Sequence, residues 1–271
     1  MFKRKRKSSP ISPTSAPKRS TLIKSLNALP ENTFQTRFSP QNSPSHNHET
    51  TTYTTSPIIF SQTLPPTLLN KCFSLIATTS QQDYETSSFG WHPTRKLREM
   101  QDRDMRFLLL YSSPSSSSPS KDEDENKDEQ FQGFTSFTFT HDSHPAVPVL
   151  YVYEIHLVPS AQGIGLGKFL MDLVLGIARK AGVEKVMLTC FVANERALGA
   201  YRKWGFGVDV CSPGERRLRG KIWKADYVIM SLELGGDGDG DREGGEGEWE
   251  DDDDDGDGEV EVGEDHEGDD K

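Results

Sequence analysis

The six residues Gln162-Gly163-Ile164-Gly165-Leu166-Gly167 lie between an apolar run and an amphipathic helix, and this arrangement decides the fold. Upstream, residues 149–158 read VLYVYEIHLV, which predicts a buried strand. Downstream, apolar residues recur at helical spacing: Phe169, Leu170, Leu173, Val174, Ile177 and Ala178. Glycines let the backbone approach a ligand, and the first turn of a helix has free N–H groups. A strand, a glycine turn and a helix in this order therefore predict an anion-binding site.

The spacing within this turn selects among phosphate-binding patterns. The dinucleotide pattern needs a glycine where Lys168 stands, and the P-loop needs Ser or Thr where Phe169 stands. The pattern Q-x-x-G-x-G, at Gln162, Gly165 and Gly167, instead resembles the pyrophosphate-binding motif of the GNAT acetyltransferases, which bind acetyl-CoA. Taken alone, the motif is also compatible with a glycine-rich turn that binds no ligand.

A second run strengthens this resemblance. Residues 185–192, KVMLTCFV, predict another buried strand, and Asn194, Ala197 and Tyr201 follow on one face of a helix. The run N-x-x-A-x-x-x-Y-x-x-x-G-F is similar to the second GNAT signature, in which the asparagine holds the cofactor arm and the tyrosine lies near the thioester sulfur. The resemblance implies that Tyr201 protonates the leaving thiolate. The alternative is a tyrosine that only packs against the cofactor.

Segments outside these motifs narrow the resemblance to the NatD-type N-terminal acetyltransferases. They are YETSSFGWHPTRKLREMQDRDMRFLLLY at 84–111, CSPG at 211–214 and DYVIMSLEL at 226–234, and the match covers residues 62–234. The resemblance implies an α/β GNAT fold with a mixed central sheet flanked by helices. It also implies acetyl transfer from acetyl-CoA to the N-terminal amine of histone H4 and histone 2A, which begin Ser-Gly-Arg.

Acetyl transfer to an amine requires a proton acceptor, a donor for the oxyanion and a leaving thiolate. Glu154 is the candidate base, because it is the one carboxylate in the apolar strand. Strand alternation predicts that Glu154 points with Val152 and His156, whereas Tyr153 points the other way and lines the opposite wall. The alternative is an edge-strand glutamate that pairs with a nearby Lys or Arg.

The resemblance also assigns binding residues. Main-chain N–H groups of residues 155–157 are the expected oxyanion donors, because GNAT folds splay this strand. The residues expected to contact acetyl-CoA are Ile155, His156, Leu157, Val158, Gln162, Gly163, Ile164, Gly165, Leu166, Gly167, Lys168 and Asn194. The residues expected to contact the substrate are Tyr84, Phe89, Trp91, Asp142, Ser212 and Tyr227, with Phe89 standing where the family usually has tryptophan. Alternatively, the aromatic residues of 84–91 only cap the core and residues 212–214 only form a turn.

Composition divides the chain into three regions. Residues 1–60 are basic and rich in Ser and Pro, and their composition predicts disorder. Residues 61–234 form the expected GNAT domain, in which residues 112–130 are a low-complexity loop between two strands. Residues 235–271 hold 20 acidic residues against Arg242 and Lys271, and this tail is also expected to be disordered.

The same composition bounds location and partners. The run KRKRK at 3–7 resembles a nuclear import signal, although a solvated basic tail is the alternative, and we expect the nucleus and cytoplasm. Histone N-terminal tails are the expected partners, with ribosomes or nascent chains as a second candidate. The acidic tail would repel DNA, so no direct nucleic-acid binding is expected, and no run is apolar enough for a membrane span. A monomer is expected.

Cysteine and histidine usage predicts neither a disulfide framework nor a metal. The three cysteines form no CxxC pair, and the seven histidines form no ligand pattern. Two rival functions remain: a GNAT enzyme acting on lysine or a small amine, and a non-catalytic histone-binding module. Segments 84–111 and 211–234 argue against the first, and the intact turn with Glu154 argues against the second.

Overall fold

The computed structural model describes residues 16–40, 44–114, 129–142, 146–214, 216–218 and 221–235. Their main feature is a nine-stranded sheet in the order β1-β2-β4-β5-β6-β7-β11-β8, with β3 also paired to β4. The strands of this sheet are β1 (Ser45–His48), β2 (Thr51–Thr55), β3 (Ile59–Phe60), β4 (Arg106–Pro114), β5 (Gln130–His141), β6 (Pro148–Leu157), β7 (Lys185–Phe191), β8 (Gly207–Val208) and β11 (Tyr227–Glu233). A separate hairpin pairs β9 (Arg216–Leu218) with β10 (Lys221–Trp223).

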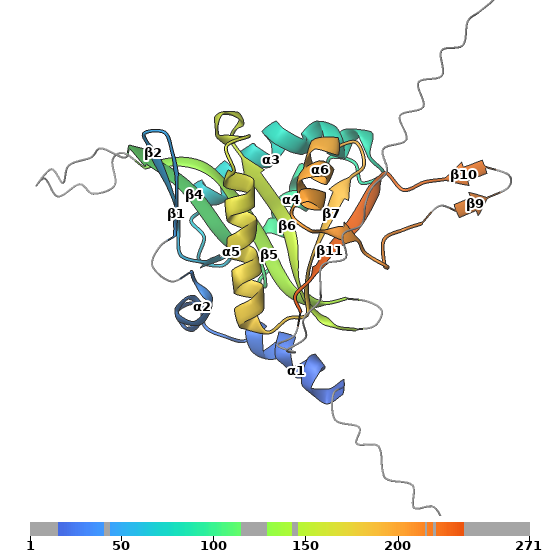
Figure 1. Ribbon diagram of the computed structural model, residues 1–271, viewed down its shortest axis with the longest axis horizontal. Coiled ribbons are helices and arrows are strands. Elements are labelled where there is room, and N and C mark those ends of the chain that lie inside the picture. Colours follow the sequence, from blue (N-terminus) through green and yellow to red (C-terminus); the bar gives the residue numbers. More distant parts are fainter. Residues whose placement is uncertain are drawn as a thin grey trace, which may run out of the picture. The chain divides into compact units, whose positions relative to one another are not determined.

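Helices cover both faces of the sheet, as Figure 1 shows. They are α1 (Ala16–Asn27), α2 (Glu31–Phe38), α3 (Pro66–Thr86), α4 (Pro93–Met100), α5 (Leu166–Ala181) and α6 (Glu195–Lys203). One core cluster joins α1, α2, α5 and α6 to one face, and a second joins α3 and α4 to the other. The predicted α/β fold, with a mixed sheet flanked by helices, is confirmed. None of the helices in the described ranges combines the length and apolar content that a bilayer crossing requires.

The glycine turn (residues 162–167) lies within the parallel crossover of the sheet. Strands β6 and β7 are parallel, whereas the other paired strands run antiparallel. The chain crosses from β6 to β7 through a 3₁₀ turn (Pro159–Ala161), the glycine turn and α5. The predicted apolar stripe of α5 is buried at Leu170, Val174, Ile177 and Ala178. This burial holds the helix on the sheet and fixes the position of its N-terminus.

Strands β6 and β7 separate beside the glycine turn. Their pairing runs from Val149 to Val152 of β6, whereas pairing between β6 and β5 continues to Leu157. The backbone of β6 beyond Val152 therefore faces a gap instead of β7. This is the splayed strand that the sequence resemblance implied.

A β-bulge in β6 corrects one sequence prediction. Glu154 lies opposite Ser136 of β5 and Val152 lies opposite Phe137, which leaves Tyr153 as the extra residue. A bulge of this kind interrupts strict alternation. Val152 packs in the core on the α5 side, whereas Glu154 and His156 contact α3 and α4. The prediction that Val152 and Glu154 share a face is therefore wrong, and Tyr153 lines a cavity together with Arg95, Lys96 and Glu99 of α4.

The amino-terminal region is the second correction. Residues 16–40 and 44–60 form helices and strands, so the prediction of disorder is wrong for them. Phe34 and Ile58 have no exposed surface, and the buried guanidinium of Arg106 lies 4.6 Å from the Phe34 ring centroid. A small number of apolar side chains is enough to order this polar segment, because each of them is buried against the sheet. Residues 1–15, with the basic run, lie outside the described residues.

The predictions for the low-complexity loop and for the acidic tail fall largely outside the residues that the structure describes. The strands that flank the low-complexity segment pair antiparallel as β4 and β5, and they extend to Pro114 and from Gln130. The loop residues 115–128 lie outside the described residues. So do residues 236–271, which hold nearly all of the acidic tail.

Candidate active site

The glycine turn has a backbone that other residues would adopt only under strain. Gly163 and Gly165 have φ angles of 86° and 90°. Only glycine occupies this region without a steric penalty, which accounts for two of the three glycines of the turn. Gly165 is also the N-cap residue of α5, so the turn leads directly into the first helical N–H groups.

Gln162 connects the turn to its neighbours. Its Nε2 donates to the Leu157 carbonyl at 3.1 Å, and its Oε1 accepts from Nη1 of Arg196 at 3.0 Å. Arg196 was not predicted, although it lies within the second signature, two residues after Asn194. Because Arg196 comes from α6, this bond joins the two signatures in space.

A cavity of about 730 Å³ adjoins the turn, in the gap between β6 and β7. It is lined by most of the predicted cofactor residues, namely Ile155, His156, Leu157, Gln162, Gly163, Gly165, Gly167, Lys168 and Asn194, and also by Tyr153, Glu154 and Tyr201. The side chains of Val158, Ile164 and Leu166 pack in core clusters next to the turn instead. The side chain of Leu166 is fully buried, so only its main-chain atoms could make the predicted contact with a cofactor.

These residues fit acetyl-CoA. The volume lies within the usual range of ligand pockets, about 300–1,000 Å³. The N-terminus of α5 favours an anion, and Lys168 and Arg196 add positive charge to the walls. Asn194 caps α6 by accepting from the Ala197 N–H at 3.1 Å, and its Nδ2 donates to Asp83 at 3.2 Å. Its side chain is therefore fixed at the cavity wall.

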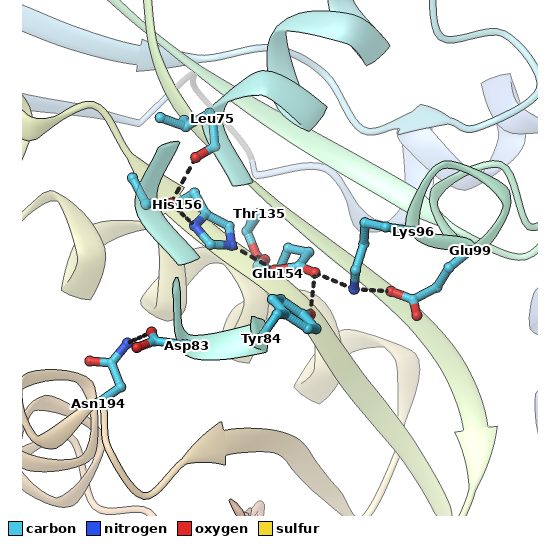
Figure 2. Close-up of polar contacts among 10 residues, drawn as sticks. Leu75, Asp83, Tyr84, Lys96, Glu99, Thr135, Glu154, His156 and Asn194 are labelled. Atoms are coloured by element: carbon cyan, nitrogen blue, oxygen red, sulfur yellow. Dashed lines mark hydrogen bonds and ion pairs between the residues drawn. The ribbon is translucent and has the colours of Figure 1, made fainter. Parts of the chain in front are cut away.

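Glu154 is the centre of a buried polar network, shown in Figure 2. Its Oε1 accepts from Lys96 Nζ at 2.8 Å and from the Tyr84 hydroxyl at 3.4 Å. Its Oε2 lies 2.6 Å from Nε2 of His156, whose Nδ1 lies 2.6 Å from the Thr79 hydroxyl. Of these partners, neither Lys96 nor Thr79 was predicted from the sequence.

The network keeps Glu154 ionised. Burial alone would raise the pKa of Glu154, but the hydrogen bond with His156 and the charge of Lys96 outweigh it and lower the pKa to about 2. Burial likewise opposes the charge of Lys96, but Glu154 raises the pKa of Lys96 above its ordinary value. Such a carboxylate is a strong electrostatic group and a weak proton acceptor. Glu154 pairs with a lysine, as in the alternative, but β6 lies between β5 and β7 and is not the edge strand that the alternative supposed.

Tyr201 and Cys190 both line the cavity of about 730 Å³. Tyr201 is 9% exposed, and burial raises the pKa of its phenol, as do the neighbouring Cys190 and Glu154. The phenol therefore keeps its proton at neutral pH. A protonated hydroxyl in this position is suited to donate a proton to a leaving thiolate.

A second cavity, of about 260 Å³, lies on the other side of Tyr153. It shares Tyr84, Val152, Tyr153, Thr189 and Phe191 with the first cavity. The predicted substrate residues Tyr84, Phe89 and Trp91 line it, together with the unpredicted His92, Arg95, Lys96 and Glu99. The structure brings these three aromatic residues together at this cavity, and Tyr84 and Trp91 also pack against the second core cluster, so the alternative of a cap on the core stays open.

The loop after α3 is joined to the start of β11. The main-chain N–H and the hydroxyl of Ser88 both donate to the carboxylate of Asp226, the hydroxyl at 2.9 Å from Oδ1. Beside this contact, the Phe89 ring lies 5.0 Å from the ring of Tyr227, a predicted substrate residue. We call the Ser88–Asp226 and Phe89–Tyr227 contacts the bridge.

Asp142 and Ser212 are not among the residues that line either cavity. Asp142 is buried, and its Oδ2 lies 2.7 Å from Lys185 Nζ, which is also 2.7 Å from Asp209. The prediction that Asp142 receives a substrate arginine is therefore corrected, because this carboxylate is part of a buried ionic cluster. Ser212 accepts the Ile229 N–H at 3.0 Å, as expected for a residue that holds a turn on β11.

Comparisons with known proteins agree with this geometry. Residues 81–206 match the model of the acetyltransferase (GNAT) family, and the chain carries a domain of the GNAT acetyltransferase superfamily. The chain is 34% identical over 89 residues to N-alpha-acetyltransferase 40 of Saccharomyces cerevisiae, covering 27% of this chain and 31% of that protein. It is 39% identical over 66 residues to the mycothiol acetyltransferase of Pseudarthrobacter chlorophenolicus, covering 24% of this chain and 20% of that protein. The chain thus spans less than a third of each of these relatives.

Among solved structures, the chain resembles Arabidopsis thaliana NAA60 in complex with a bisubstrate analogue. The sequence identity is 13% and the TM-score is 0.45, with 68% of this chain and 99% of that chain covered.

Proposed function

We propose that this chain is an acetyl-CoA-dependent N-terminal acetyltransferase of the NatD type, acting on histone H4 and histone 2A termini that begin Ser-Gly-Arg. The observation that carries the proposal is a pair of cavities that share a wall at Tyr153, next to an ionised Glu154. One cavity fits acetyl-CoA, which supplies an acetyl thioester when bound. The other, lined by aromatic residues, is the place for the amine.

The residues at the shared wall have complementary roles. The free α-amine of a protein has a pKa of about 7.7–8.0, so much of it is neutral near physiological pH. The nitrogen becomes positively charged as it attacks, and the ionised Glu154 stabilises that charge. Residues 155–157 of β6 lie beyond its pairing with β7. We propose that those of their main-chain N–H groups that do not pair with β5 donate to the developing oxyanion. Tyr201 would supply a proton to the leaving thiolate, and the proton lost from the amine nitrogen would pass through solvent in the cavity to restore the Tyr201 phenol.

The bridge favours a chain terminus as the substrate. It connects the loop after α3 to β11 next to the smaller cavity. A cavity closed on one side in this way admits the end of a chain more readily than a side chain in the middle of one. Its volume, about 260 Å³, is well below that of the cofactor cavity, about 730 Å³. The resemblance of segments 84–111 and 211–234 to NatD enzymes supports the same substrate class.

A GNAT enzyme acting on a small amine is the second candidate. The similarity to mycothiol acetyltransferase favours it, because that match is 39% identical over 66 residues, against 34% over 89 residues for N-alpha-acetyltransferase 40. The α3–α4 loop discriminates between the two, since its aromatic residues have a clear use only if the substrate is a peptide.

Partners and location follow from the proposed substrate. Histone N-terminal tails are the proposed partners, and the nucleus and cytoplasm are the proposed locations. The basic run at residues 3–7 supports nuclear entry.

A panel of acceptors with acetyl-CoA tests the proposal. The acceptors are an SGRGK-type peptide, the same peptide with a blocked amino terminus, and a series of small amines, with products located by mass spectrometry. We expect transfer to the free terminal amine and none to the blocked peptide. Acetylation of the lysine in the blocked peptide, or transfer only to small amines, would overturn the NatD specificity.

A further inference from the structure

We infer that the amino-terminal hairpin (residues 45–55) is part of the cofactor site, and that His46 is a positioning residue for the pyrophosphate-binding turn. The inference rests on the proposed use of acetyl-CoA. It concerns a segment that the sequence motifs do not include. Strand β1 is at the edge of the sheet, yet it reaches the glycine turn more than 100 residues further along the chain.

The contact is a single hydrogen bond to the main chain of the turn. Nε2 of His46 lies 2.9 Å from the carbonyl oxygen of Ile164. A carbonyl only accepts, so Nε2 carries the proton in this bond. The bonded carbonyl stands between Gly163 and Gly165, the two residues with positive φ.

This bond orients the N–H group that follows. The carbonyl of Ile164 and the N–H of Gly165 belong to one peptide plane, and in a trans peptide they point in opposite directions. When His46 holds the carbonyl on the hairpin side, the Gly165 N–H points away from the hairpin. Gly165 lines the larger cavity. His46 therefore directs a donor toward the side where the pyrophosphate would bind.

The ring of His46 also packs against the turn. A Cβ at Gly165 would lie 3.3 Å from Cε1 of His46, so the imidazole is in direct contact with this glycine. The ring lies 5.8 Å from Phe169 and 6.4 Å from Tyr53, its partner across the hairpin. Tyr53 is buried with residues beneath the turn, namely Leu110, Ala161, Leu166 and Leu170. The hairpin is thus anchored, and His46 is held in place.

A turn with two such glycines needs this support. Glycine accepts both signs of φ, so an unsupported turn would sample many backbone states and would lose that freedom on binding. Fixing one peptide plane in advance reduces the entropy lost when the ligand binds. Loss of one net hydrogen bond should weaken binding about five- to tenfold.

The test uses calorimetric binding of acetyl-CoA and of CoA to the full chain. The variants are His46→Ala, His46→Gln and His48→Ala. Glutamine places an amide N–H near the position of Nε2, and His48 is a matched control two residues along the same strand. We expect His46→Ala to weaken both ligands about five- to tenfold, and His46→Gln to restore most of the affinity. His48→Ala should bind as the wild type does.

Kinetics separate positioning from a general loss of structure. In His46→Ala the KM for acetyl-CoA should rise, whereas kcat and the KM for the peptide should stay unchanged. The melting temperature should fall by no more than a few degrees, as expected for the loss of one net hydrogen bond. Equal affinity in His46→Ala and wild type, no rescue by glutamine, or an equal effect of His48→Ala would each overturn the inference. If the wild type itself binds no acetyl-CoA, the proposed function fails instead.

Discussion

Replacing Glu154 by glutamine should destabilise the protein by an amount that depends on pH in a defined way. The substitution keeps the shape of the Glu154 side chain and removes its negative charge, which the contacts with Lys96 and His156 stabilise. In the folded chain the pKa of Glu154 is lowered from 4.5 to about 2. At 1.36 kcal/mol for each pH unit, this difference corresponds to about 3 kcal/mol of stability. The side chain is 6% exposed, so solvent screening removes little of it.

The sign follows from proton uptake. Between pH 4.5 and pH 2 the unfolded chain binds a proton at Glu154 and the folded chain does not. Stability therefore rises with pH in this window and is fully present above about pH 5. By pH 3, about 2 of the 3 kcal/mol should be lost. The free-energy difference between wild type and Glu154→Gln should be constant from pH 7 to pH 5 and then shrink.

Urea unfolding at pH 7, 5 and 3 measures this difference, in which the contributions of groups that do not interact with Glu154 cancel. Glu85→Gln, a change at an exposed glutamate of α3, is the control and should show no such trend. If the difference for Glu154→Gln is the same at pH 3 as at pH 7, the carboxylate is not held ionised and the network is wrongly described.

The same variant tests the chemistry. Loss of an electrostatic stabiliser should lower kcat about 10²-fold while acetyl-CoA affinity changes little. The acid limb of kcat/KM, near the pKa of the substrate amine, should persist in Glu154→Gln. Disappearance of that limb would show that Glu154 titrates there, and would restore the role of general base.

Three further changes test separate parts of the site. Gly165→Ala should destabilise the fold by about 1–3 kcal/mol and weaken acetyl-CoA binding, because φ is 90° and the added Cβ would press on His46. Urea unfolding measures the first effect and calorimetry the second. An unchanged affinity would show that the turn is not part of the cofactor site. Asp142→Asn should lower stability by about 1–3 kcal/mol without changing the KM of an SGRGK peptide, because this carboxylate binds Lys185; a raised KM at full stability would reinstate it as a substrate residue. Asp226→Ala should raise the KM for the peptide several-fold, as expected for the free energy of one or two hydrogen bonds, and should leave acetyl-CoA affinity unchanged. Equal KM values in the variant and the wild type would show that the bridge does not shape the substrate cavity.

The sequence predicted the parts of the site that depend on local patterns. The turn at 162–167, the helix after it, the strand at 185–191 and the position of Asn194 each follow from spacing within one short segment. The orientation of Tyr153 did not follow. It depends on a bulge, and the bulge is defined by how β6 pairs with β5 and not by the residues of β6 alone.

Residues that reach the site from distant elements were missed for a related reason. Lys96 and Thr79 lie 58 and 77 positions from the groups they bind, Glu154 and His156, and no spacing rule connects them. The hairpin with His46 was missed because polar composition predicts disorder on average. A segment of this kind can be ordered by a single buried side chain such as Tyr53, since its strands pair with a sheet that already exists.

The state of Glu154 bears on which amine this site can use. A carboxylate with its pKa lowered to about 2 cannot remove a proton efficiently from a strongly basic amine. The substrate must then arrive already neutral. An α-amine with a pKa of about 7.7–8.0 is neutral to about a quarter at pH 7.4, whereas a lysine amine with a pKa of about 10.4 is neutral to about one part in a thousand. The difference is about 10²-fold, and it requires no contact with the rest of the peptide. Under the proposed function, the Lys96–Glu154 pair would favour terminal amines, because the ionised Glu154 is a weak proton acceptor. The bridge and the aromatic residues are the proposed means of selecting among termini.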